Sequence, residues 1–239
     1  MTRHRSMGPL CALALLALPA SGAAALVSTF DTTNEGWTVN SSQGAAGVDA
    51  FAWEAGSGNP GGAIAASDIG NQGGWWFVAS AAWAGDWRPY LGGSIHFEVY
   101  ATAGTSTTLN PPVEAVVLAL ADGGRLRAKQ GAGALLDDWV AVDIALTADR
   151  FNLTNSSYSG FEEGLAHVTG LIVLGDFVFQ QGDRTRLDNV RIAAAPEPGS
   201  TWLLLLGLGA FALARACIGA PPRAGGAYGS RRFAGGPVA

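Results

Sequence analysis

The chain has little charge, one lysine and only two cysteines. Charged residues make up 14% of its 239 residues, against about 25% in an ordinary soluble domain. Because the net charge is −5, no sequence-wide basic surface exists to neutralise phosphates, which argues against nucleic-acid binding. Cys11 and Cys217 lie in the two terminal apolar segments, so no disulfide can cross-link the region between them.

Glycine, in contrast, is abundant. Its 34 residues are about twice the average share of about 7%, a composition that excludes coiled coils and long helical bundles. The region between the two ends, about 170 residues, is long enough to build a hydrophobic core without disulfides.

The N-terminus has the three parts of a secretory signal peptide. Arg3 and Arg5 precede the apolar run Leu10–Leu18, which is followed by small residues up to Ala25. This pattern predicts a signal peptide at residues 1–25, cut after Ala25 or Ala23. A retained anchor is the alternative, but the apolar run is too short to span ~30 Å of hydrocarbon.

A second apolar segment, Thr201–Ala220, lies near the C-terminus. It predicts a membrane helix of marginal length, ended by Pro221-Pro222; a buried core helix is the alternative. Residues 26–195 hold 18 acidic and 8 basic residues, net −10, whereas the rest of the chain is net +5. This asymmetry predicts that the acidic region lies outside the membrane and the basic ends inside.

The Gly-, Ala- and Pro-rich basic tail, residues 221–239, is expected to be disordered.

The segment Pro196-Glu197-Pro198, followed by the apolar helix and Arg215, resembles the PEP-CTERM sorting signal. It differs in that paired arginines, Arg231-Arg232, come well after the helix. The resemblance implies a bacterial envelope protein that is a substrate of an exosortase. Such a membrane protease cuts near the Pro-Glu-Pro element and releases or re-anchors its cargo at the cell surface, often alongside exopolysaccharide.

Between the ends, short alternating apolar runs are separated by glycine clusters, the pattern of an all-β domain. In one run, Ile95, Phe97 and Val99 alternate with His96, Glu98 and Tyr100, so one face enters a core and the other meets solvent. About nine strands are expected in a jelly-roll, galactose-binding-like β-sandwich, with one short helix at Phe161–Val168. The strands are expected at Val27–Phe30, Ala63–Ala66, Trp75–Ala79, Ile95–Val99, Val113–Leu120, Arg125–Ala128, Trp139–Leu146, Leu171–Leu174 and Thr185–Ile192.

The region from Phe30 to Ile192 resembles the laminin domain IV family. The resemblance rests on Phe30-Asp31 with Glu35-Gly36-Trp37, on Gly58–Gly62 followed by Asp68, on Trp75–Ala79, on Gly85-Asp86, on Tyr90–Phe97, on Leu165–Ile172 and on Thr185–Val190. It implies a jelly-roll domain similar to galactose-binding and carbohydrate-binding domains, with no known catalytic residues. The cysteine-rich modules that surround this domain in laminins are absent here, so laminin's partners are not carried over.

Several of these residues have a structural interpretation. Gly61-Gly62 and Gly92-Gly93 suit turns that need a positive φ. Trp37, Trp75 or Trp76, and Trp139 are expected to bury their rings between the sheets.

Asp31 and Asp188 lie where the first loop meets the last strand, a place where sandwiches of this type hold a structural ion. Carboxylates and backbone carbonyls are the ligands that Ca²⁺ prefers. The sequence therefore predicts one structural Ca²⁺ at these two residues. A plain turn or strand-end cap is the alternative for Asp188.

Trp53, Trp83 and Trp87 lie in Gly- and Ala-rich stretches near Glu54 and Asp86. Exposed indoles can stack on pyranose rings, and carboxylates accept hydrogen bonds from sugar hydroxyls. Trp53, Trp83, Trp87 and Asp86 are thus predicted to bind carbohydrate; packing at the edge of the core is the alternative.

No catalytic residues are predicted. His96 and His167 are too few for a zinc site, there is no Gly-x-Ser-x-Gly turn, and the adjacent pairs Asp137-Asp138 and Glu162-Glu163 cannot face each other within one strand. We expect an exported envelope protein with a non-catalytic β-sandwich that acts in adhesion or extracellular matrix structure. The alternative is a carbohydrate-binding module that recognises exopolysaccharide; an enzyme ranks third.

Overall fold

The computed structural model describes residues 24–42, 48–69, 74–102, 108, 113–129, 131–132, 136–178 and 182–195. The chain divides into two compact units, Met1–Ala195 and Pro196–Ala239, and every described residue belongs to the first. The predicted sorting signal, its apolar helix and the basic tail lie outside the described residues, as do residues 1–23 of the predicted signal peptide. No helix within the described ranges is long and apolar enough to span a membrane.

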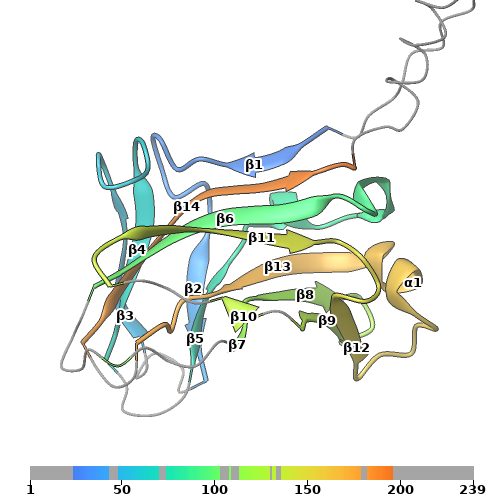
Figure 1. The fold of residues 1–239 in the computed structure, drawn as a ribbon. Helices are drawn as coiled ribbons and strands as arrows, with labels where there is room; N and C mark the ends of the chain where they lie inside the picture. Colours follow the sequence, from blue (N-terminus) through green and yellow to red (C-terminus); the bar gives the residue numbers. More distant parts are fainter. Residues whose placement is uncertain are drawn as a thin grey trace, which may run out of the picture. The chain divides into compact units, whose positions relative to one another are not determined.

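The strands of the described region form two antiparallel sheets, which face each other as a sandwich (Figure 1). Sheet A has the order β11 (Trp139–Ala145), β6 (Ser94–Thr102), β14 (Arg184–Ala193), β4 (Ala63–Asp68) and β3 (Val48–Glu54), and β1 (Leu26–Ser28) also pairs with β14. Sheet B has the order β12 (Phe151–Thr154), β9 (Arg125–Ala128), β8 (Val116–Leu120), β13 (Val168–Leu174), β5 (Trp75–Val78) and β2 (Thr38–Ser41). A small ribbon joins β7 (Val113–Glu114) to β10 (Gly131–Ala132).

The core lies between the sheets and follows the alternation read from the sequence. On β6, Ile95, Phe97 and Val99 are completely buried, and Val116 and Leu118 on β8 are buried in the same cluster. Each fully buried side chain of this kind stabilises the fold by about 1.5–3 kcal/mol. The prediction of a jelly-roll β-sandwich is confirmed.

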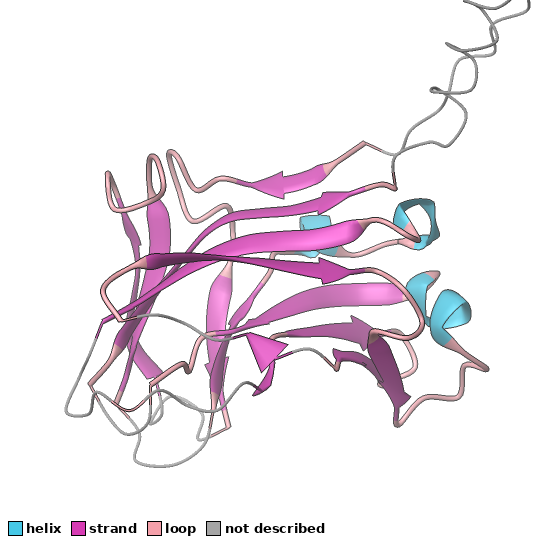
Figure 2. Cartoon of the chain, in the orientation of Figure 1, coloured by secondary structure: helices cyan, strands magenta, loops and turns pink. Residues whose placement is uncertain are grey.

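Helices are few and short in the described region (Figure 2). The helix expected at Phe161–Val168 is α1, Phe161–Leu165, and Val168 already begins β13. Two 3-10 turns, η2 (Ala81–Trp83) and η3 (Arg88–Tyr90), connect β5 to β6. Since Trp83 and Tyr90 are buried, both turns are fixed to the core.

The strands that the sequence did not reveal are those without a clear apolar alternation. β2 is mostly polar, β12 is short, and β3 contains a bulge between Asp49 and Ala52, where Ala50 has a φ of 51°. A bulge shifts the side-chain period by one residue, which hides the strand from a pattern of period two.

The fate of the predicted core tryptophans depends on which sheet face each occupies. Trp37 and Trp75 are completely buried, as predicted. The prediction for Trp139 is wrong: its ring is partly exposed. The inward positions of β11 are Val142 and Ile144, so Trp139 lies on the outer face of sheet A.

The loop between β3 and β4 closes over the middle of β14. Gly61 has a φ of 94°, in the region that favours glycine, and a Cβ there would collide with the carboxylate of Asp31. A Cβ on Gly58 would likewise meet the carboxylate of Asp188. On β14, a bulge at Asn189, with a φ of 52°, follows Asp188. The loop and the bulge together position the two aspartates.

Candidate functional site

The outer face of sheet A carries one continuous row of paired residues, a row that crosses all five main strands. The register joins Trp139 on β11 to Tyr100 on β6, Tyr100 to Arg186 on β14, Arg186 to Ala65 on β4, and Ala65 to Ala52 on β3. Paired residues project on the same side of a sheet. The row therefore has two aromatic rings at one end, a guanidinium next to them and small side chains beyond. We call it the outer row.

The aromatic end of the outer row is held by ring contacts. The ring centroids of Tyr100 and Trp139 lie 5.6 Å apart at an interplanar angle of 52°. The guanidinium carbon of Arg186 lies 5.2 Å from the centroid of the Tyr100 ring, within the range of a cation–π contact. Both rings are partly exposed, so this end of the row offers fixed apolar surface to solvent.

A single carboxylate organises the arginines beside this row. Glu54 Oε1 accepts hydrogen bonds from Arg184, 2.7 Å from Nη2, and Glu54 Oε2 lies 2.7 Å from Arg186 Nε. Burial would raise the pKa of Glu54, but the hydrogen bonds from Arg186 and Arg184 outweigh it and hold the pKa below its usual value. Glu54 is 130 residues from Arg184 in sequence, and only the pairing of β3, β4 and β14 brings them together.

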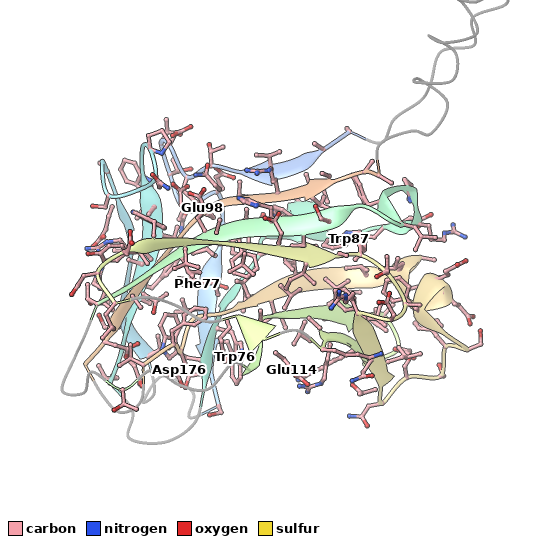
Figure 3. All side chains as sticks on the ribbon, in the orientation of Figure 1. Trp76, Phe77, Trp87, Glu98, Glu114 and Asp176 are labelled. Atoms are coloured by element: carbon pink, nitrogen blue, oxygen red, sulfur yellow. The ribbon has the colours of Figure 1, made fainter. Side chains whose placement is uncertain are left out.

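The next positions on the same face are polar. His96 Nδ1 lies 2.9 Å from Asp143 Oδ1, and Asn189 Nδ2 donates to Glu98 Oε2 over 2.9 Å; Glu98 is labelled in Figure 3. His96 was expected to meet solvent, but it is only 8% exposed, because Asp143 and Glu98 flank its ring. Polar groups that can donate and accept hydrogen bonds thus continue along this face from the aromatic end.

Asp31 and Asp188 both lie beside the β3–β4 loop, where Gly61 approaches the carboxylate of Asp31 and Gly58 that of Asp188. Asp188 is completely buried and accepts hydrogen bonds of 2.6 Å from the backbone N–H groups of Asn59 and Asn189. Burial, together with the nearby charges of Glu98 and Asp31, raises the pKa of Asp188 to about 6, against the lowering effect of these hydrogen bonds.

The oxygen atoms that could bind an ion at Asp31 and Asp188 already accept hydrogen bonds from the protein. Both carboxylate oxygens of Asp188 accept backbone hydrogen bonds, and Asp31 Oδ2 accepts one from the Thr29 hydroxyl over 2.8 Å. Among the described residues, no group of three or more His, Cys, Asp or Glu side chains is arranged to hold a metal ion. The calcium site at Asp31 and Asp188 stays a prediction.

The structure buries two of the four predicted carbohydrate-binding residues. Trp83 and Trp87 are 2% and 1% exposed, and their rings lie in the core, with centroids 6.3 Å apart (Figure 3 labels Trp87). The expectation that these two rings are exposed is wrong, because η2 and η3 turn both indoles inward.

Trp53 and Asp86 are accessible, but they do not lie in the outer row. Trp53 is 37% exposed and its indole donates to the backbone carbonyl of Phe30. It pairs with the core residue Ile64, so it projects on the opposite side of sheet A. Asp86 forms an exposed ion pair with Arg88, 2.6 Å between Oδ2 and Nη2. The hydrogen bonds from Arg88 lower the pKa of Asp86.

Sequence reasoning missed Tyr100, Trp139, Arg184 and Arg186 as candidates. A signal was present in the alternation of β6 and β14, which places Tyr100 and both arginines opposite the core residues. These residues form one surface only because strands that are distant in the sequence pair side by side in sheet A.

Residues 194–216 match the PEP-CTERM protein-sorting motif. The motif indicates an exported, envelope-associated protein that is processed at its C-terminus, and it confirms the sorting-signal resemblance around Pro196, Glu197 and Pro198. No curated protein matches the chain.

Several solved structures are similar to this chain at low identity. The family 11 carbohydrate-binding module from Clostridium thermocellum, solved with a β-1,3-1,4-mixed-linked tetrasaccharide, is 16% identical, has a TM-score of 0.48 and aligns over 72% of this chain and 97% of that chain. The K1 cleaved adhesin domain of the Lys-gingipain from Porphyromonas gingivalis is 14% identical, with a TM-score of 0.44 over 72% and 99% of the two chains. The L4b domain of human laminin alpha-2 is 11% identical, with a TM-score of 0.40 over 51% and 70%. A laminin domain is thus a structural neighbour, and membership of the laminin domain IV family stays a prediction.

Proposed function

We propose that the β-sandwich is a non-catalytic polysaccharide-recognition domain of an exported protein, and that the outer face of sheet A is its binding surface. The observation that carries this proposal is the outer row, in which Trp139 and Tyr100 present partly exposed rings on adjacent, hydrogen-bonded strands. Rings fixed on strands lose little conformational entropy on binding, and their apolar faces suit the C–H faces of pyranoses.

The surroundings of the rings supply the polar part of such a site. Arg186, Arg184 and Glu54 hold one another in place beside Tyr100. The next residues of the row, Ala65 and Ala52, are small, and Ala65 is completely buried. Preorganised donors and acceptors next to an apolar platform fix the orientation of a sugar ring. In this proposal, adhesion or a matrix role follows from polysaccharide binding.

The export indicated by the sorting motif would bring this surface to envelope polysaccharide. We propose that an exosortase acts near Pro196-Glu197-Pro198 and that the apolar segment after it holds the protein at the membrane until then. The partner of the sandwich is then exopolysaccharide, whereas the partner of the C-terminal segment is the protease.

Affinity electrophoresis of the full chain through gels that contain different polysaccharides tests the proposal. Trp139→Ala should abolish the retardation of the wild-type protein. The matched control is Trp76→Ala, which removes a partly buried tryptophan from sheet B (Figure 3) and should leave the retardation unchanged. Circular dichroism must show that both variants are folded. Equal retardation of wild type and Trp139→Ala would refute the proposed surface.

A further inference from the structure

Two buried carboxylates face each other at the end of sheet A where β4 ends and β14 begins. Asp68 is the last residue of β4, and Asp183 immediately precedes β14. Their backbones are joined by a hydrogen bond of 3.0 Å from Asp68 N to Asp183 O, next to one of 2.8 Å from Gly182 N to Asp68 O. Asp68 is 5% exposed and Asp183 is completely buried.

Both side chains point toward the interior of the sandwich. On β14, Thr185 and Leu187 are completely buried, so Asp183, two residues before Thr185, occupies the next inward position. On β4, Ile64 and Ala66 are core residues, which places Asp68 on the same inward side. Like charges opposite each other in a sheet destabilise the pairing.

The carboxylate of Asp183 has no hydrogen-bond partner on either oxygen, and the hydroxyl of Thr185 has none either. An ionised carboxylate buried without partners is strongly unfavourable. Orphaned acceptors on consecutive inward positions indicate that an additional group completes the site.

The electrostatic surroundings favour a cation as that group. Burial, together with the charges of Asp176 and Asp68, raises the pKa of Asp183 to about 8, against the lowering effect of its own backbone N–H. Asp176 follows β13 at this same end of the sandwich (Figures 1 and 3). The neighbouring basic residue, Arg184, lies on the outer face, where it donates hydrogen bonds to Glu54 and to the Ser67 hydroxyl.

We propose that this end of the sandwich binds one hard divalent cation, with Ca²⁺ as the probe, through the carboxylates of Asp68 and Asp183 and the hydroxyl of Thr185. Hard cations prefer such a set of oxygen ligands. The site consists of two carboxylates and a neutral oxygen, with the charge of Asp176 nearby. It is separate from the predicted site at Asp31 and Asp188, because Asp188 lies on the outer face of β14 and Asp183 on the inner one.

The full chain, stripped of metal with a chelator, is titrated with CaCl₂ by calorimetry at pH 7, and its thermal unfolding is followed with and without the ion. Asp183→Asn should bind one ion fewer per chain than wild type and should lose the corresponding rise in Tm. Asp149→Asn is the control, because Asp149 is an exposed aspartate beside Arg150, and this variant should bind as many ions as wild type. This outcome does not depend on polysaccharide binding, so the two proposals fail separately.

Thr185→Val is the second test variant, for use if Asp183→Asn does not fold. It keeps the side-chain shape, removes the hydroxyl and should weaken the binding of this ion. The proposal is overturned if wild type binds no ion, or if Asp183→Asn and Thr185→Val bind as many ions as wild type with the same affinity. If wild type binds no ion and its stability falls as the pH rises toward 8, then Asp68 and Asp183 share a proton in place of a cation. This result would also overturn the proposal.

Discussion

The hydroxyl of Ser28 on β1 accepts a hydrogen bond of 3.2 Å from the indole N–H of Trp83 on η2. The same oxygen lies 3.0 Å from the indole nitrogen of Trp37, and the rings of Trp37 and Trp83 meet edge to face with centroids 5.8 Å apart. Trp87 then donates to the backbone carbonyl of Trp83. These contacts tie β1 and the β5–β6 connection into one aromatic cluster.

Trp83→Ala should therefore destabilise the fold. Loss of a large buried aromatic side chain costs about 3–5 kcal/mol, which urea denaturation of the full chain would measure. The control is Leu91→Ala in the same connection, since Leu91 is 38% exposed and its truncation should have little effect. A Trp83→Ala variant with unchanged stability and lost polysaccharide binding would instead support the predicted sugar-binding role of Trp83, despite its burial in the structure.

Calcium should raise the thermal stability of the domain through Asp188 if the predicted ion is present there. The buried carboxylate lies close to the negative charges of Glu98 and Asp31, and an ion would relieve this repulsion. Asp188→Ala should remove this contribution to the Tm shift. A shift that is the same in wild type and Asp188→Ala would show that Asp188 acts as a plain cap.

The bridge from Glu54 to the two arginines should make stability depend on pH in the acidic range. The pKa of Glu54 in the folded protein lies below its ordinary value, so its stabilising contribution is present above the unfolded value of about 4.3 and is lost as the pH falls through the folded value. Thermal unfolding between pH 3 and 6 should show a steeper acid loss in wild type than in Glu54→Gln. Identical profiles would mean that solvent screens the bridge.

Processing at the sorting motif should be visible in the mass of the secreted protein. We expect mass spectrometry to locate the mature C-terminus near Pro196–Pro198, because the motif match spans residues 194–216. Glu197→Ala should leave the protein uncut, and Glu163→Ala, in α1, is a control at a glutamate outside the motif. A secreted wild-type species that still ends at Ala239 would contradict this prediction.

The sequence predicted those elements whose pattern is local. The alternation of β6 identified its inward face directly, since a period of two needs only neighbouring residues. β3 was not predicted because its bulge interrupts that period. The sequence did not predict the burial of Trp83 and Trp87, because no pattern in their Gly- and Ala-rich stretch indicates that this stretch turns back over the core.

The sequence by itself determined the all-β class, the strands of the core and the sorting motif, because alternation and short linear motifs are properties of adjacent residues. The tertiary structure alone decided which aromatic rings face solvent, that Glu54 joins two arginines 130 and 132 residues away, and that Asp68 lies opposite Asp183. These relationships depend on the order and register of strands far apart in the chain, which are fixed when the two sheets pack.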